Sequence, residues 1–354
     1  MLSNRFRYDA HSIYDLSPLQ QDMVRSVEDK LQQGVYTFES TPCPICGGEA
    51  CTPVAGKDRY GLALQVVVCD GCGLVRSNPR MTQQSYNQFY NDEYRKLYTT
   101  NEKPTVAWFM QEQRSKGTWI LPFIESTGLL AGKNYSDLLV LEVGCGAGGI
   151  MHYFREKGFQ TLGIDLGEEY IEFGRANFGL DLRVATLQDL ELTRQPDIII
   201  YSHVLEHILE PGVEMEQLKA LMKPDTILYI EVPGIKNLWR SYSNDLLRYL
   251  QNAHVSHFSL TSLSNLMHRH GYERVAGNEV INSVFRLAKP GKSQPPIVHD
   301  REAVLRDLRR VERLRKYSPF VFYELTGKVK QTLLAAARRL GLYSLLRAIW
   351  RKIR

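Results

Sequence analysis

An unbroken apolar run followed by glycines is the most distinctive pattern of hydrophobic and polar positions in the chain. Residues 138–149 read LLVLEVGCGAGG, with no alternation before the glycines. Such a run predicts a strand buried on both faces of a parallel sheet, and the glycines predict a tight turn after it. Residues 149–157 then predict a helix that ends at Gly158, and 160–165 predict a second buried strand that ends at Asp165. Together these elements form one strand–helix–strand unit with a nucleotide site at its first turn.

Further apolar stretches extend this unit into a larger α/β domain. Short runs rich in branched residues predict strands, and amphipathic stretches between them predict helices. The predicted elements are strands at 180–185, 197–203 and 226–232, helices at 168–178 and 261–269, and a closing hairpin at 272–289.

The glycine pattern fits two kinds of ligand. Gly144, Gly146 and Gly149 match the G-x-G-x-x-G of dinucleotide enzymes, whereas Gly148 in the third place matches the G-x-G-x-G of S-adenosylmethionine (SAM) enzymes. An acid such as Asp165 can hold ribose hydroxyls in either case. Glu142 favours SAM, because a carboxylate beside the loop would repel phosphate but suits the ammonium and sulfonium groups of SAM.

Two motifs resemble those of class I SAM-dependent methyltransferases. Residues 141–148 (LEVGCGAG) resemble motif I, and residues 201–208 (YSHVLEHI) resemble the fourth motif in its V-L-E-H version. The resemblance implies a Rossmann-like, seven-stranded sheet with SAM at its first turn. The implied SAM-binding residues are Glu142, Gly144, Cys145, Gly146, Gly148, Asp165, Leu166, Leu187, Gln188, Ser202 and His203.

The length and composition of the chain indicate that this domain is joined to further segments. The chain has 354 residues, 44% of them hydrophobic and 23% charged, which indicates a globular core domain with appendages. No apolar run approaches the eighteen or so residues of a membrane-spanning helix, and no signal peptide is indicated, so we expect a cytoplasmic protein. The expected divisions are an N-terminal helical segment (1–40), a zinc ribbon (41–80), a helical lid or linker (81–134), the methyltransferase domain (135–290) and a basic helical tail (291–354).

Two C-x-x-C pairs indicate the zinc ribbon. Cys43 and Cys46 form the first pair, and Cys69 and Cys72 form the second. Each pair precedes a glycine, so two tight knuckles would present four thiolates in the closed tetrahedral arrangement of a structural Zn²⁺ site. A redox pair or an iron–sulfur site is the alternative. Cys51 reads as a small hydrophobic residue or a thiol near the site.

Tyrosines recur every four residues after the ribbon. Tyr86, Tyr90, Tyr94 and Tyr98 would form a slowly drifting stripe along one helix, either packed on the core domain or partly closing over SAM. The ribbon, an N-P-R sequence, this stripe and motif I, in that order, resemble bacterial zinc-ribbon methyltransferases associated with surface polysaccharide or deoxysugar modification. That resemblance implies that Tyr90 and Tyr94 line the SAM site.

The ends of strands four and five are the expected reactive edge, because ligands of open parallel sheets bind at the carboxyl ends of the strands. A histidine there could take a proton from an oxygen nucleophile. Four histidines compete for this role: His203, His207, His254 and His257. We take His257 as the first choice for this base and His207 as the second. For the Glu206–His207 pair, a structural cap or a supporting role is the alternative to catalysis. His254 and His257 are expected in a loop before the helix at 261–269. The aromatic and basic residues of 235–252 are expected to shape the acceptor pocket or to form a solvated helix; they are Trp239, Arg240, Tyr242, Arg248 and Tyr249.

The end of the chain is basic. Residues 300–317 predict a charged amphipathic helix, and 328–354 contain eight Lys or Arg and no acid. Apolar residues among the basic ones at 329–353 suit helices that lie on an anionic membrane or pack on the protein itself.

These observations predict a cytoplasmic methyltransferase, peripheral to the inner membrane face. The resemblance to zinc-ribbon methyltransferases implies a sugar nucleotide or lipid-linked glycan as the acceptor, by O- or C-methylation. An rRNA or tRNA base methyltransferase is the first alternative. The net charge of +5 and the four basic residues of the ribbon region argue against nucleic acid. The second alternative is a non-catalytic scaffold, against which the intact motif I counts.

Overall fold

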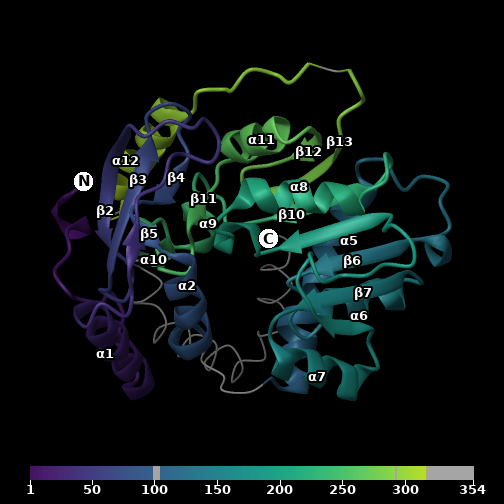
Figure 1. Ribbon diagram of the computed structural model, residues 1–354, viewed down its shortest axis with the longest axis horizontal. Coiled ribbons are helices and arrows are strands. Elements are labelled where there is room, and N and C mark those ends of the chain that lie inside the picture. The colour runs from purple at the N-terminus through teal and green to yellow at the C-terminus, as the bar shows by residue number, and fades with distance from the viewer. Residues whose placement is uncertain (99–103, 292, 316–354) are drawn as a thin grey trace, which may run out of the picture.

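The structure is a computed structural model that describes residues 1–98, 104–291 and 293–315. The tail helices expected at 329–353 lie outside these residues. The described part of the chain contains a seven-stranded sheet in the order β12-β13-β10-β9-β6-β7-β8 (Figure 1). Its strands are β6 (Leu139–Val143), β7 (Gln160–Asp165), β8 (Leu182–Val184), β9 (Ile198–Ser202), β10 (Ile227–Glu231), β12 (Tyr272–Gly277) and β13 (Asn282–Leu287).

The predicted mixed sheet is confirmed. The five strands from β8 to β10 run parallel, and the hairpin β12–β13 adds to β10 in the antiparallel sense. Successive residues of β6 and β9 point to opposite faces, and both faces are covered, which explains why these strands read as continuous apolar runs. One face packs on α5 (Gly117–Glu125), α6 (Gly149–Glu156) and α7 (Glu168–Phe178), and the other on α8 (Pro211–Leu221) and α11 (Leu260–Arg269).

The segment before the central sheet, within the helical linker expected at 81–134, consists of several short helical elements rather than one continuous helix. It consists of α4 (Val106–Trp108), a π-helical turn (η3, Phe109–Gln113), a 3₁₀ turn (η4, Arg114–Lys116) and α5. The turns pass very close to α6: a Cβ on Gly149 would lie 2.4 Å from Cβ of Gln113, and one on Gly117 would lie 2.5 Å from the ring of Tyr153. This close passage explains the kinks, which residue periodicity alone does not reveal.

A second, four-stranded sheet is built around the cysteine pairs. It contains β2 (Cys51–Lys57), β3 (Ala63–Cys69), β4 (Val75–Ser77) and β11 (Ser256–His257), in the order β11-β4-β3-β2. Strand β11 comes from the segment between β10 and α11, so a segment of the domain that contains the seven-stranded sheet completes the ribbon sheet. His254 lies in a loop before α11, as expected, but His257 lies in β11, and the side chains of both are buried.

The N-terminal residues form η1 (Asn4–Phe6) and α1 (Pro18–Gln32), and the two-stranded pair β1 (Phe38–Glu39) and β5 (Arg80–Met81) follows. The tyrosine stripe spans α2 (Gln83–Phe89), the π turn η2 (Tyr90–Tyr94) and α3 (Arg95–Tyr98). Centroids of successive stripe rings are 5.8, 4.1 and 5.2 Å apart. A π turn holds more residues than an α turn, so it offsets the drift that a four-residue spacing would otherwise produce.

The remaining elements are short except for the last. They are η5 (Tyr135–Asp137), η6 (Leu205–His207), α9 (Leu238–Ser241), α10 (Leu246–Tyr249) and α12 (Arg301–Leu314). Val304, Leu305 and Leu308 of α12 pack with valines of β2 and β3 on the ribbon sheet. None of the helices in the described ranges is long and apolar enough to span a bilayer.

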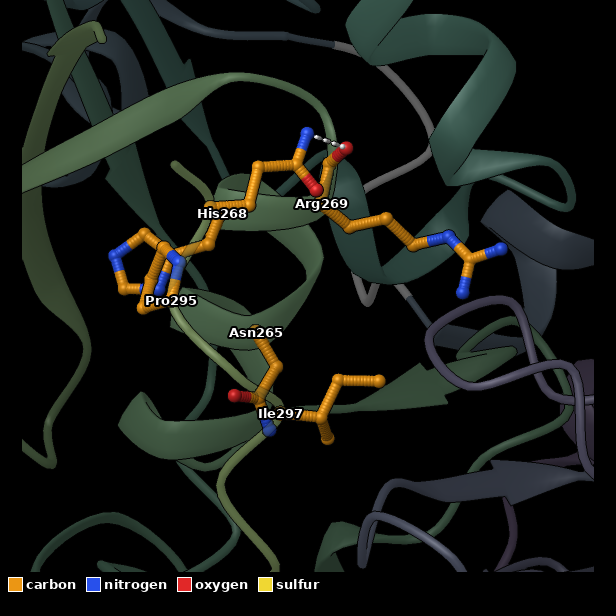
Figure 2. A pocket seen from close by; sticks show the side chains of 6 residues that line it. Asn265, His268, Arg269, Pro295 and Ile297 are labelled. Carbon is orange, nitrogen blue, oxygen red and sulfur yellow. Dashed lines mark hydrogen bonds between the residues drawn. The ribbon is translucent and has the colours of Figure 1, made fainter. Parts of the chain in front are cut away.

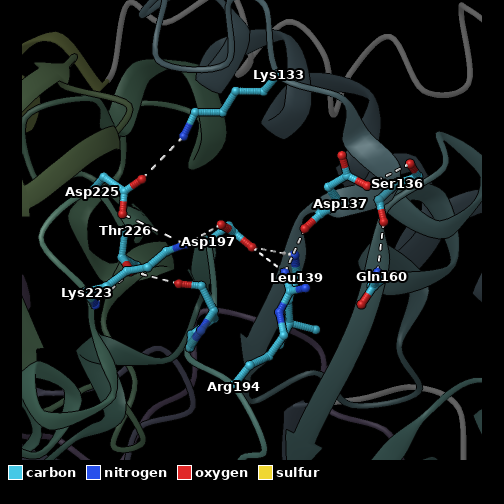
Figure 3. Close-up of polar contacts among 11 residues, drawn as sticks. Lys133, Ser136, Asp137, Leu139, Gln160, Arg194, Asp197, Lys223, Asp225 and Thr226 are labelled. Atoms are coloured by element: carbon cyan, nitrogen blue, oxygen red, sulfur yellow. Dashed lines mark hydrogen bonds and ion pairs between the residues drawn. The ribbon is translucent and has the colours of Figure 1, made fainter.

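A cluster of charges fastens the edge of the sheet where its parallel strands begin, opposite the edge where ligands bind (Figure 3). Asp197 accepts hydrogen bonds from Leu139 N at 2.8 Å, Arg194 at 2.7 Å and Lys223 at 2.6 Å. Burial alone would raise the pKa of Asp197, but the bonds from Lys223 and the backbone outweigh it and hold the pKa below the usual 3.8. The carboxylate therefore joins the starts of β6, β9 and β10.

Replacing Asp197 by Asn is expected to lower the free energy of unfolding by about 2 kcal/mol at pH 7, a value reduced for the partial exposure of its lysine and arginine partners. Because the folded-state pKa is lowered, this stabilisation is present above the unfolded pKa and is lost as pH falls through the folded one. Urea unfolding at pH 7 and below pH 3.8 measures it. A difference of equal size at both pH values would contradict this account.

Candidate active site

The glycine loop and the fourth motif (201–208) meet at the carboxyl ends of β6 and β9. Gly144, Gly146 and Gly148 all have positive φ, which favours glycine. At Gly144 space is also limiting, because an added Cβ would lie 2.4 Å from Cγ2 of Val204. Val204 belongs to the V-L-E-H sequence, so the structure brings the two predicted motifs into contact.

Asp165, at the end of β7, faces this loop. Its Oδ2 accepts a hydrogen bond from Gly146 N at 2.8 Å, and its Oδ1 accepts one from Gly167 N at 2.7 Å. The next residue, Leu166, is 72% exposed despite being apolar, as suits a side chain that packs against a ligand ring. Of the two residues expected near the adenine, Leu187 is buried and Gln188 is exposed.

Glu142 is a buried carboxylate in β6, immediately before the loop. It is 3% exposed, and its Oε2 has no hydrogen-bond partner. Burial raises the pKa of Glu142 well above its usual value; the charge of Asp165 adds to this, and Lys116 opposes it. A buried acceptor without a partner is costly, so this position suits a ligand that brings a donor or a positive charge.

The fourth motif forms an acid–histidine cluster beyond β9. Glu206 is 1% exposed, and neither of its carboxylate oxygens has a hydrogen-bond partner. Its Oε1 lies 3.5 Å from His203 Nδ1, 3.9 Å from His207 Nε2 and 3.9 Å from His254 Nε2. Three of the predicted site histidines therefore surround one carboxylate.

His207 has the geometry of a proton acceptor. Its Nδ1 lies 2.8 Å from the carbonyl oxygen of Ala253, an arrangement that places the proton on Nδ1 and leaves the lone pair on Nε2. Burial lowers the pKa of His207, while Glu206 and the Ala253 carbonyl oppose this. The rings of Tyr90 and Tyr94 present faces or edges to His207 at centroid distances of 6.0 and 5.8 Å.

His257 lies in a different environment. Its ring is fully buried in β11, and neither ring nitrogen has a hydrogen-bond partner. Burial lowers its pKa to about 3, so the ring is neutral near pH 7. The Tyr249 ring covers it at a centroid distance of 5.1 Å. His207, with 11% of its side chain exposed, is better placed to reach an acceptor.

Sequence reasoning missed one residue near this edge, Trp119, whereas Ser202 was among the residues expected there. Trp119 of α5 donates from Nε1 to Glu231 Oε1 at 3.1 Å, and Ser202 donates to Oε2 of the same carboxylate at 3.2 Å. His203, with a positive φ of 59°, lies 4.0 Å from this carboxylate. Tyr86, one of the stripe tyrosines, donates to Ala253 O at 2.7 Å. Only spatial proximity links Trp119 to the site, so no sequence signal could have identified it.

The segment 235–252, which was expected to shape an acceptor pocket or to form a solvated helix, is partly aromatic. Tyr242 and Tyr249 pack edge to face at 5.0 Å, and Tyr249 donates to Pro233 O at 3.0 Å. Trp239 is 64% exposed. The side chain of Arg240 lies outside what the structure describes, and Arg248 lies over the ring of Tyr14.

A surface pocket between α11 and residues 294–297 (Figure 2), which Asn265, His268 and Arg269 help to line, lies on another part of the domain.

The four cysteines of the ribbon converge. Their sulfur atoms all lie within 4.8 Å of one another. Two separations are 3.5 Å (Cys43–Cys72) and 3.4 Å (Cys46–Cys69), close to the roughly 3.8 Å expected for tetrahedral thiolates around zinc. The knuckles match each other: Gly47 N donates to Cys43 O at 2.8 Å, and Gly73 N donates to Cys69 O at 2.9 Å.

Comparison with known families agrees with this geometry. Residues 111–276 match a family model described as "Methyltransferase domain". Somewhat less than half of the chain is therefore similar to a methyltransferase domain. The matched region includes the glycine loop, Asp165 and the Glu206–His207 pair, and the unpartnered carboxylate of Glu142 fits a cationic cofactor such as SAM.

Relatives of the methyltransferase domain are distant. The ubiquinone biosynthesis O-methyltransferase of Rhodopseudomonas palustris (strain HaA2) is 28% identical over 113 residues, which cover 30% of this chain and 44% of that protein. The protein of the same name from Nitrobacter winogradskyi is 26% identical over 113 residues, covering 30% and 42%. The chain thus spans less than half the length of these curated relatives.

The solved 1,6-didemethyltoxoflavin-N1-methyltransferase of Burkholderia thailandensis, with bound S-adenosylhomocysteine, is 16% identical with a TM-score of 0.43, covering 64% of this chain and 96% of that one.

Proposed function

We propose that the chain transfers a methyl group from SAM to a hydroxyl group, or to an activated carbon, of a sugar or glycan. The observation that carries this proposal is the pairing of the buried Glu206 with His207, just after Val204, which packs against the glycine loop. The two relatives are named as O-methyltransferases, which supports an oxygen nucleophile. The zinc-ribbon resemblance supports a sugar nucleotide or lipid-linked glycan as the acceptor.

Different residues are assigned to SAM binding and to proton transfer. SAM, when bound, supplies a methyl carbon already activated by its sulfonium. The glycine loop, Asp165 and Leu166 hold the adenosine part, and Glu142 offers its carboxylate to a positive charge. His207 Nε2 accepts the proton of the attacking hydroxyl, and Glu206 stabilises the imidazolium that results. The tyrosine rings of the stripe shield this edge from water and present π faces suited to a sulfonium.

Titration calorimetry with SAM, followed by transfer assays with labelled SAM, tests the proposal. We expect SAM to bind and label to enter a nucleotide sugar or glycan, but not RNA. A chain that binds SAM but labels only RNA would favour the base-methylating alternative. A chain that does not bind SAM would be a scaffold. Gly144→Val serves as the matched variant, since its side chain would collide with Val204 and should abolish SAM binding.

We further propose that the four cysteines hold one structural Zn²⁺. Four thiolates in a closed set leave no open coordination position, so the ion would stabilise the ribbon and take no part in methyl transfer. Gly48 and Gly71 lie so close to Cys46 Sγ that added Cβ atoms would be 3.4 and 3.0 Å from it. Because glycine has no side chain, the sulfur atoms have room to converge.

A contact with anionic membrane is proposed for the basic end of the chain. Within the described residues, α12 turns Arg306, Arg309, Arg310 and Arg313 to solvent. Co-sedimentation with vesicles that contain anionic lipid, but not with neutral vesicles, is the expected result. Equal recovery with both kinds of vesicle would contradict the proposal.

A further inference from the structure

A six-residue segment connects the cysteine ribbon to the proposed base. We call residues 252–257 the bridging segment. On one side, Val255 N donates to Glu206 O at 2.8 Å. On the other side, Ser77 N donates to Val255 O at 2.9 Å, and β11 pairs with β4. The segment therefore lies between the ribbon strand β4 and the turn that carries Glu206 and His207.

The carbonyl of Ala253 is the critical group in this segment. It accepts from His207 Nδ1 at 2.8 Å and from the hydroxyl of Tyr86 at 2.7 Å. Ala253 is fully buried and Tyr86 is 6% exposed, so water does not substitute readily for either partner. A carbonyl oxygen has two lone pairs, and these two donors use both.

Three further hydrogen bonds connect the bridging segment to the N-terminal part of the chain. Ser77 Oγ donates to His254 O at 3.2 Å. Asn252 donates from its side chain to Asp58 Oδ2 at 3.2 Å, and from its backbone N to Tyr98 OH at 3.1 Å. Asp58 is fully buried. The backbone that faces His207 is thus fixed by side chains from the ribbon and the tyrosine stripe.

We propose that Tyr86 and Ser77 are positioning residues for His207, acting through the bridging segment to hold its ring in the tautomer with a proton on Nδ1. This inference rests on the proposed role of His207 as base, but ring orientation can be measured without turnover. In this arrangement the ribbon and the tyrosine stripe form one wall of the active site. They influence the orientation of the His207 ring through the carbonyl group of Ala253.

The test variants are Tyr86→Phe, which removes only the hydroxyl, and Tyr86→Phe combined with Ser77→Ala. We expect kcat to fall about tenfold in the first and further in the second, since part of a general-base contribution is lost. KM for SAM should not change, because neither residue contacts the glycine loop or Asp165. Tyr36→Phe is the control, since it removes another buried tyrosine hydroxyl, bonded to Glu93, without touching the bridging segment.

The pH profile separates positioning from a general loss of stability. The groups that face His207 are Glu206, His203 and His254, together with the rings of Tyr90 and Tyr94. In the variants the Ala253 carbonyl loses its second donor and the ring becomes better hydrated, and both changes favour the imidazolium. The acidic limb of kcat should therefore move to higher pH in the Tyr86 variants and stay in place in Tyr36→Phe.

Nitrogen-15 NMR of the histidine rings, assigned with His207→Gln, gives the direct readout. The wild type should show a single tautomer at His207, and the Tyr86 variants should show a mixture. A His207 ring with unchanged tautomer and unchanged pKa in the double variant would overturn the inference. If the ring changes while kcat does not, the positioning holds and the assignment of His207 as base fails.

Discussion

Replacing His207 by Gln is expected to lower kcat by about 10²–10⁴-fold, the usual contribution of a positioned general base. Glutamine keeps a similar size and a donor for the Ala253 carbonyl, but it cannot take up a proton. SAM affinity should be unchanged, because the side chain contacts neither the glycine loop nor Asp165. Single-turnover transfer of labelled methyl groups and SAM calorimetry measure the two quantities separately.

The pH dependence follows from the same geometry. The base must be neutral to accept a proton, and burial lowers the pKa of His207 below 6.5. The wild-type rate should therefore persist below pH 6.5 and fall only at more acidic values. His11→Gln, at a histidine whose side chain is 85% exposed, is the matched control. Full activity in His207→Gln, with loss of activity in His257→Gln at an unchanged melting temperature, would instead assign the base to His257.

Removal of the proposed zinc ion is expected to have the largest effect on stability. Structural zinc sites contribute about 10–16 kcal/mol of apparent binding free energy in zinc-finger peptides. Chelation, or Cys72→Ser, should therefore release one metal ion per chain and lower the melting temperature. It should also increase hydrogen exchange in β2, β3 and β4.

Cys51→Ser is the control for the zinc prediction. Cys51 lies in β2 opposite Cys69 but is not among the four converging sulfurs. This variant should keep one zinc per chain and the wild-type melting temperature. Purified protein without bound metal, or a Cys72→Ser variant that melts with the wild type, would contradict the proposed site.

Local patterns were sufficient for most of the central sheet. The run at 138–143 predicted β6, because a strand covered on both faces must be apolar throughout. The glycines at 144–148 were predicted to turn towards a ligand, and the structure shows positive φ at Gly144, Gly146 and Gly148. The pairing of cysteines at fixed spacing likewise predicted their convergence, since each knuckle is formed by neighbouring residues.

The features that the sequence did not predict all depend on distant contacts. Strand β11 contains two residues, too few to show a period, and its partner β4 lies about 180 residues earlier. The environment of His257 follows from that pairing alone, so its burial was not foreseen. The breaks at Phe109–Gln113 and Arg114–Lys116 arise from close passage over α6, which depends on where that helix lies.

The pairing of β11 with β4 has a consequence for how such enzymes can change over evolutionary time. If the ribbon were exchanged for that of another protein, β11 would be left with an open edge and the bridging segment with new neighbours. The two regions cannot be inherited as independent modules, and substitutions in 75–77 should be tolerated only together with compatible ones in 253–257. Chimeras that cross this boundary should recover activity when both stretches come from the same parent.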